Sequence, residues 1–208
     1  MSDAPNTATD VASRIGPRFV AVAALACAAT AAAVERFMGR LWLGPDGRFG
    51  LWEGSVWSSE QSQRLADPYS FTHVCHGILF CGALWLVARK LPLRLRYLAA
   101  AAIESCWEIL ENSPWVLARY RATTIELGYM GDSILNSMSD IGMMSLGFLL
   151  ASRVGWKLSA ALVIVMELGL AFTVRDNLTL NVVMLVHPSP AVRAWQEAGR
   201  PPDAHHAP

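Results

Sequence analysis

Charged residues are scarce in this sequence of 208 residues: only 16% are Asp, Glu, Lys or Arg, against roughly 25% in a soluble domain. Hydrophobic residues make up 53% of the chain, and the mean hydropathy is +0.32. Neither sign of charge is in excess, because 17 basic residues balance 17 acidic ones. We therefore expect a single membrane domain, with membrane lipids as partners and no nucleic-acid partner.

Cysteines are also few, and no two of them form a CxxC pair. This pattern excludes a zinc finger. Each cysteine lies within an apolar segment, which favours the role of a small buried hydrophobic residue. Cys75, beside His76, is only a weak indication of a ligand pair.

Long hydrophobic runs predict an all-α fold, a polytopic membrane bundle of about five transmembrane helices. Asp67 followed by Pro68 is typical of a helix start, and the 22 residues from Asp67 to Ala88 are long enough, at about 33 Å, to cross the hydrocarbon. The first apolar run, from Phe19 to Val34, suits either a cleaved signal or a retained helix, and we expect it to be retained. The helices are expected near 19–39, 67–88, 92–113, 132–153 and 156–175.

The remaining segments complete one membrane domain over residues 19–188. Residues 178–187 are apolar but too short to span, so this segment is expected to be interfacial or re-entrant. We expect a flexible cytoplasmic N-terminus over residues 1–18 and a disordered tail over residues 189–208.

Basic residues predict the orientation. They gather before the first helix and in two short loops without acids, at Arg14, Arg18, Arg89, Lys90, Arg94, Arg96, Arg153 and Lys157. By the positive-inside rule we expect this side to be cytoplasmic.

Polar residues inside the helices form layers near the opposite, outer side. At about 1.5 Å per residue, the deeper layer lies roughly 12–14 Å down and comprises His76, Glu104, Asp140 and Glu167. A shallower layer at roughly 6–9 Å comprises His73, Glu108 and Asn136, and the rim holds Glu111, Asp132, Arg119 and Arg121. A central charge facing lipid costs about 2.5–3.5 kcal/mol, so we expect a polar well that opens outward.

This well suggests an enzyme acting on a lipid or lipid-linked headgroup. The candidate catalytic residues are His73, His76, Glu104, Glu108 and Asp140, and the candidate substrate-binding residues are Glu111, Asn112, Arg119, Arg121, Asp132 and Asn136. The arginines suit an anionic group. A divalent metal ion is the cofactor considered, with His73, His76, Glu108 and Asp140 as candidate ligands.

Two other functions stay open. In a proton-coupled carrier, Glu104, Asp140 and Glu167 would form a relay, although the uncharged cytoplasmic halves of the helices argue for a closed floor. In a non-catalytic assembly protein, the polar stripes would join helices, with the acids paired to arginines. A separation of more than about 12 Å between the Glu104 and Asp140 carboxyl groups would remove the common site. The sequence does not decide the oligomeric state.

Three motifs follow one another between about Leu51 and Pro188: LWEGSVWSSEQSQRLADPYSFTHVCHG, ESCWEILENSPWVLARYRATTIELGYMGDSILNSMSD and VRDNLTLNVVMLVHP. In these motifs the chain resembles uncharacterised protein family 0314, whose members are bacterial inner-membrane proteins. The resemblance implies a multi-pass plasma-membrane protein with no established activity. The acid-bearing helix followed by GDS and an Asp-bearing helix also looks, more distantly, like the VanZ-like membrane proteins.

Overall fold

The computed structural model describes residues 15–124 and 129–202, and within these ranges the regular structure is helical. The exception in that part of the chain is one isolated β-bridge, between Trp52 and Ala66. The helices, in chain order, are α2 (Pro17–Phe37), α3 (Ser70–Ala88), α4 (Leu93–Glu111), α5 (Pro114–Thr123), α6 (Ile134–Ala151), α7 (Trp156–Thr173), α8 (Leu178–Val186) and α9 (Pro190–Glu197).

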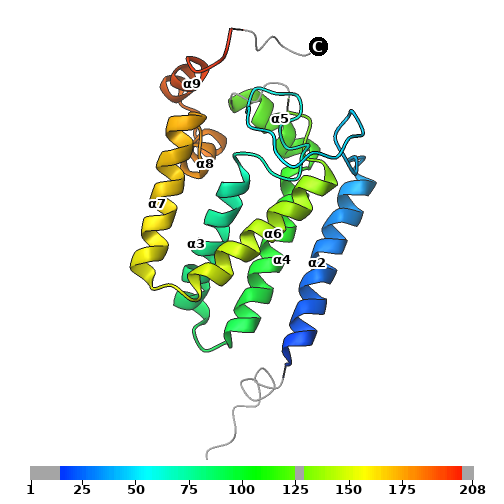
Figure 1. The fold of residues 1–208 in the computed structure, drawn as a ribbon, viewed down its shortest axis with the longest axis vertical. Helices are drawn as coiled ribbons and strands as arrows, with labels where there is room; N and C mark the ends of the chain where they lie inside the picture. Colours follow the sequence, from blue (N-terminus) through cyan, green and yellow to red (C-terminus); the bar gives the residue numbers. More distant parts are fainter. Residues whose placement is uncertain (1–14, 125–128, 203–208) are drawn as a thin grey trace, which may run out of the picture.

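Four helices, α2, α3, α6 and α7, are long and apolar enough to cross a membrane. Helix α4 is as long as α3 and runs among them, but it carries five charged residues: Arg94, Arg96, Glu104, Glu108 and Glu111. Helix α4 nevertheless runs from one end of the bundle to the other, at the position of the third predicted span (Figure 1). The all-helical membrane bundle is therefore confirmed.

Helix boundaries follow from local chemistry. Helix α6 begins where the Ser133 hydroxyl accepts a hydrogen bond from Asn136 N, and α8 begins where the Asn177 side chain accepts one from Leu180 N. Prolines at the first helical position begin α2, α5 and α9, where their missing N–H is tolerated. The five long helices, α2, α3, α4, α6 and α7, start and end within three residues of the predicted bounds.

Helices α3 and α6 approach each other closely enough for their backbones to touch. A side chain at Gly77 would collide with the Met144 carbonyl, and one at Gly147 would collide with the Val74 carbonyl. Small residues permit this approach. The contact also brings His73 of α3 close to Asp140 of α6, with His73 Nε2 3.8 Å from Asp140 Oδ2.

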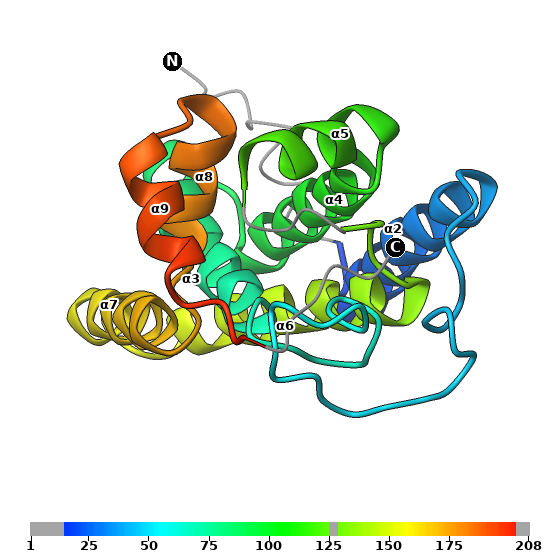
Figure 2. The ribbon, with the colours of Figure 1, turned by 90° about the horizontal axis from the view of Figure 1, so that it is seen from above.

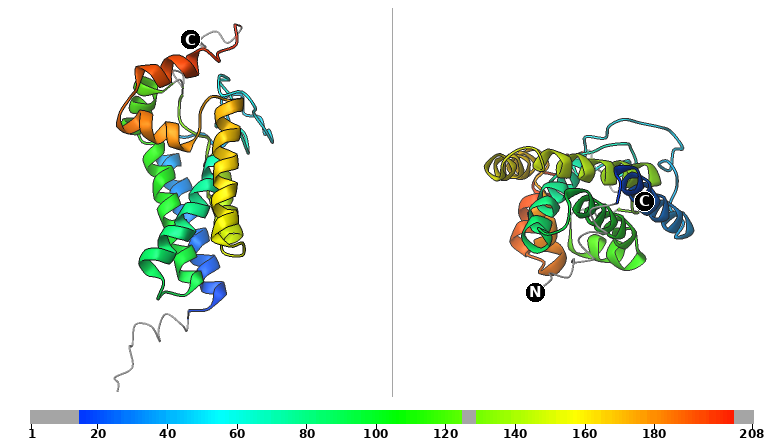
Figure 3. Two further views of the ribbon diagram at one scale, coloured as in Figure 1. Left: turned by 90° about the vertical axis from the view of Figure 1, so that its left-hand side faces the viewer. Right: turned by 90° about the horizontal axis from the view of Figure 1, so that it is seen from below.

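The polar connections gather at one end of the bundle. Viewed from above, α2 and α7 stand at opposite ends of the molecule, and residues 38–69 fold over α6 between them (Figure 2). This segment is tied down by a hydrogen bond from Gln63 Nε2 to the Gly131 carbonyl, at 2.8 Å, and one from Asn136 Nδ2 to the Arg64 carbonyl, at 3.0 Å. The short connections lie at the other end, beside the start of α2 (Figures 1 and 3).

Two segments differ from expectation. Helix α5 occupies part of the predicted polar connection, because Ser113 caps a helix that starts at Pro114. Helix α9 lies in the stretch predicted to be disordered: Ser189 caps it, and Gln196 is buried. Residues 1–14 of the predicted flexible N-terminus, including Arg14, lie outside the described residues.

Candidate histidine–carboxylate site

Glu104 on α4 contacts both histidines of α3. Its Oε1 lies 2.6 Å from His73 Nδ1 and 3.0 Å from His76 Nδ1, and its Oε2 lies 3.1 Å from His76 Nδ1. The two histidines share a face because they are three residues apart on one helix. Glu104 is fully buried. Two imidazoles therefore converge on one buried carboxylate.

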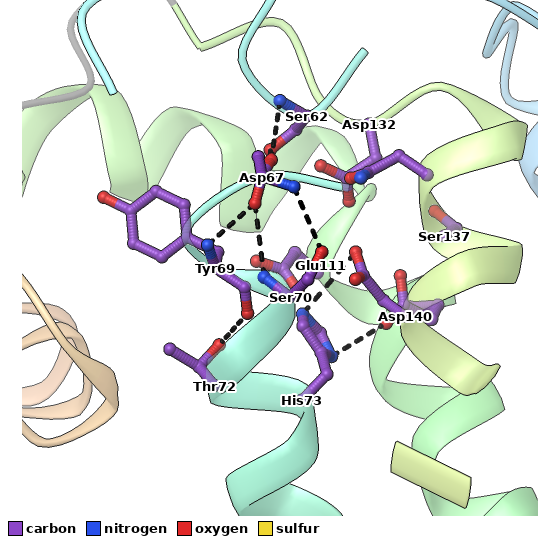
Figure 4. Close-up of polar contacts among 12 residues, drawn as sticks. Ser62, Asp67, Tyr69, Ser70, Thr72, His73, Glu111, Asp132, Ser137 and Asp140 are labelled. Carbon is purple, nitrogen blue, oxygen red and sulfur yellow. Dashed lines mark hydrogen bonds and ion pairs between the residues drawn. The ribbon is translucent and has the colours of Figure 1, made fainter. Parts of the chain in front are cut away.

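Two further carboxylates face His73. Glu108 Oε1 lies 3.4 Å from His73 Nδ1. Asp140 Oδ2 lies 3.8 Å from His73 Nε2 on the other side of the ring (Figure 4). Glu108 is fully buried, and neither of its oxygens accepts a hydrogen bond from any described residue. Because Glu104 and Asp140 contact one imidazole, their carboxyl groups are well inside the separation of about 12 Å that would have removed a common site.

Asp67 and Asp132 lie at the outer rim of the cluster. Asp67 accepts hydrogen bonds from the backbone N–H groups of Ser62 and Tyr69, at 2.9 and 2.7 Å. Tyr129 OH donates to Asp132 Oδ1 at 2.5 Å, and Asn112 Nδ2 donates to Asp132 Oδ2 at 2.9 Å. Burial raises the pKa of both carboxyl groups above its ordinary value, and these hydrogen bonds oppose the rise.

A cavity of about 40 Å³ opens among these residues, which is room for about three water molecules. Its wall includes His73, His76 and Asp140 from the predicted catalytic set, together with Glu111 and Asp132 from the predicted substrate-binding set. Helix α8 contributes Leu178 and Asn181. Below the cavity, toward the other end of the bundle, lies an apolar cluster made of Cys81, Ala100, Ala101, Met144 and Phe148.

The other predicted substrate-binding residues have different contacts. Arg119 Nε donates to the Leu185 carbonyl at 2.9 Å, and Arg121 Nε donates to the Tyr129 carbonyl at 2.6 Å. Neither arginine is part of the cavity wall. Through these contacts they hold α8 and Tyr129 in place, and their predicted role in binding an anionic substrate group stays a prediction. Asn136 holds the first loop, and Asn112 orients Asp132.

Glu167 does not join the histidine cluster. Its carboxylate accepts hydrogen bonds from the backbone N–H groups of Leu178 and Thr179, both at 3.0 Å, and so caps the start of α8. Glu167, the acidic residue of an otherwise apolar helix, thus stabilises the fold by capping α8. The chain turns back after Thr173 so that α8 begins beside Glu167 and reaches the cavity.

The sequence interpretation missed several residues near the site. Asp67 was assigned only as a helix start, although it lies close enough to Asp132 for the charge of Asp132 to raise the pKa of Asp67. Glu35 is fully buried on α2, and an acid in an apolar run was the signal that could have identified it. Tyr129 carries no comparable signal in the sequence.

Two groups of side chains bring ligand atoms close enough to hold a metal ion. One is His73, His76 and Glu104, and the other is His73, Glu108 and Glu111. In each group the ligand atoms lie within 4.8 Å of one another. Of the predicted ligands, the first group contains both histidines and the second contains His73 and Glu108, whereas Asp140 is in neither group.

Sequence comparison gives the family. A family model described as a protein of unknown function, DUF2585, matches residues 36–198. The chain belongs to this family. The chain is 54% identical over 163 residues to a UPF0314 protein of Rhizobium meliloti, a match that covers 78% of this chain and 83% of the relative.

Other relatives carry the same family name. A UPF0314 protein of Sphingopyxis alaskensis is 47% identical over 176 residues, covering 85% of this chain and 94% of the relative. A UPF0314 protein of Paracoccus denitrificans is 50% identical over 163 residues, covering 76% of this chain and 84% of the relative. The predicted membership of family 0314 is confirmed, whereas the VanZ-like resemblance is not supported by these matches. No solved structure matches the chain.

Proposed function

We propose that this protein is a metal-dependent membrane hydrolase acting on the headgroup of a lipid or lipid-linked substrate. The observation that carries the proposal is the convergence of His73 and His76 on Glu104, at 2.6 and 3.0 Å, beside a cavity. Two histidines and one glutamate are a ligand set that catalytic zinc takes, with a fourth position left for water or substrate.

The spacing of the three ligand atoms supports a bound divalent ion. Metal–ligand bonds of about 2.0–2.2 Å in a tetrahedral site separate neighbouring ligand atoms by roughly 3.3–3.6 Å. The contacts of Glu104 with the His73 and His76 imidazoles, at 2.6 and 3.0 Å, lie below this range. Metal binding would therefore require these side chains to move apart by rotation.

We assign the role of general base to Glu108, whose Oε1 lies 3.4 Å from His73 Nδ1. It follows Glu104 by one turn of α4, and none of the described residues donates a hydrogen bond to its oxygens. In hydrolysis the carboxylate would take a proton from the attacking water as the water oxygen forms its bond to the ester centre. It would return the proton to the leaving oxygen as the ester bond breaks.

The apolar cluster that closes the lower end of the cavity favours an enzyme over a carrier. A cluster of buried apolar side chains lies below the cavity, and it includes the fully buried Ala100, Met144 and Phe148. A proton relay would also need Glu167, whose carboxylate is occupied with the start of α8. The polar residues therefore support chemistry at one membrane surface.

The test is metal content in the full-length protein, purified without chelator and then equilibrated with Zn²⁺ or Mn²⁺. We expect about one ion per chain, and at least a tenfold loss of affinity in His73→Ala and Glu104→Gln. The matched controls are His187→Ala and Glu197→Gln, which change exposed residues of the same types. No bound metal, or equal loss in the controls, would overturn the proposal.

A second measurement tests the reaction. In proteoliposomes, release of lipid headgroups should fall strongly in Glu108→Gln while metal content is kept, because Gln cannot accept the proton. Equal headgroup release by Glu108→Gln would remove the assigned base.

A further inference from the structure

Two buried acceptors on the cavity wall lack a hydrogen-bond donor within residues 15–124 and 129–202. They are Asp140 Oδ1, on α6, and Asn181 Oδ1, on α8. The Asp140 side chain is nine-tenths or more buried, with 3% of the residue exposed. An unmet buried acceptor costs about 1–3 kcal/mol, so these two oxygens call for a ligand that donates hydrogen bonds.

The orientation of Asn181 follows from its other contact. Its Nδ2 donates to Asp176 Oδ2 at 3.1 Å, which leaves Oδ1 as the atom toward which a donor is needed. Asp140 Oδ2 faces His73 Nε2, so Oδ1 is the free oxygen of that carboxylate. The acceptor on Asn181 is thus assigned without ambiguity between its amide oxygen and nitrogen.

The remaining wall of the cavity suits a positive charge. The described residues that line it include three carboxylates, Glu111, Asp132 and Asp140, and no lysine or arginine. Aromatic residues complete the wall at Tyr69, Trp107, Tyr120 and Tyr129. Carboxylates and aromatic rings together are the groups that bind ammonium ions in proteins.

We propose that this cavity binds a primary ammonium group, so that the substrate of the proposed hydrolase carries an amine headgroup of the ethanolamine type. The inference rests on the proposed function for the reaction but not for the binding. A primary ammonium has three N–H donors, enough for Asp140 and Asn181 together. A trimethylammonium group has none and would leave both acceptors unmet.

The test compares a series of lipids that differ only in N-methylation. The full-length protein is placed in phosphatidylglycerol nanodiscs with phosphatidylethanolamine, its monomethyl or dimethyl derivative, or phosphatidylcholine, and bound lipid is counted by native mass spectrometry. We expect binding to fall at each methylation, by about tenfold or more over the series. Equal binding of all four lipids would overturn the proposal.

A soluble amine distinguishes the source of the ligand. The protein is placed in nanodiscs whose lipid is phosphatidylglycerol alone, and free ethanolamine is added. If ethanolamine stabilises the protein as much as phosphatidylethanolamine does, the ligand is a soluble amine. If only the lipid does so, it is a membrane headgroup. Either result supports an ammonium site. If neither ethanolamine nor phosphatidylethanolamine stabilises the protein, that result counts against the site.

The variant Asp140→Asn keeps the shape of the side chain and removes its charge. We expect it to lose the preference for the unmethylated headgroup, whereas Asp46→Asn, an exposed control, should keep it. Should Asp140→Asn fail to fold, the methylation series on the unchanged protein still decides. Metal bound without a headgroup preference refutes only this inference, and a preference without bound metal refutes only the proposed function.

Discussion

The close approach of α3 and α6 gives a prediction with its control in the same two helices. Adding one methyl group at Gly77 would place Cβ 2.9 Å from the Met144 carbonyl carbon and closer still to its oxygen. At Gly147 the added Cβ would lie 2.9 Å from the Val74 carbonyl carbon. Carbon atoms pack best at about 3.5–4.0 Å, so the helices must separate by several tenths of an ångström or more.

The size of the effect follows from what must move. The colliding atoms belong to the backbone, which cannot rotate away as a flexible side chain can. Overpacking in a well-packed core costs about 1–3 kcal/mol, and we expect Gly77→Ala and Gly147→Ala to lie near 3 kcal/mol. For a chain of this length that is a drop in melting temperature of roughly 6–12 °C.

The controls are Gly82→Ala on α3 and Gly142→Ala on α6. Both glycines lie in helices and are exposed, and a Cβ added there would meet nothing within 4 Å. Replacing glycine by alanine in a helix is favourable by up to about 1 kcal/mol, so these variants should be neutral or more stable.

The assay is thermal unfolding of the purified protein in detergent, with bound metal measured on the same samples. Because His73 and Asp140 each lie one turn or two before the contact, separating the helices should also weaken metal binding. If Gly77→Ala is as stable as Gly82→Ala, the backbone contact that brings the site together is refuted.

Three further predictions concern the outer end of the bundle. Glu167→Gln should speed hydrogen exchange at Leu178 and Thr179 about tenfold, because the amide offers one acceptor where the carboxylate offers two. Ser133→Ala should lower the melting temperature by roughly 2–4 °C through the lost cap of α6, worth about 1 kcal/mol. Burial raises the pKa of Asp176 to about 6, so the folded state binds this proton more tightly than the unfolded chain does. The stability contributed by the proton is then present below about pH 4 and is lost as the pH rises through about 6, so Asp176→Asn should flatten the pH dependence of melting in that window.

Each of these predictions has a contrary result. Unchanged exchange in Glu167→Gln would mean that the carboxylate does not cap α8. An unchanged melting temperature in Ser133→Ala would remove the cap of α6. A pH profile of Asp176→Asn that matches the unchanged protein between pH 4 and 6 would show that another group titrates there.

The sequence by itself determined the membrane fold. The predicted helix bounds were close because apolar runs of about 20 residues can satisfy their backbone in lipid only as helices, and prolines and capping residues mark where these helices start. The spacing of His73 and His76, and of Glu104 and Glu108, also fixed which residues share a face, since helical periodicity is a local property. Depth counting then placed these residues at one end of the bundle.

Only the tertiary structure decided which groups meet. Glu104 lies 31 residues from His73 in the sequence, and their 2.6 Å contact depends on how α3 packs against α4. The arginines were predicted at the site because their depth was right, but their direction depends on α8 and the chain around Tyr129. Glu167 had the right depth as well, yet its carboxylate caps a helix formed by the chain after the turn. Depth is set along one helix, whereas contact is set by rotation and packing between helices, and a single sequence carries little information about either.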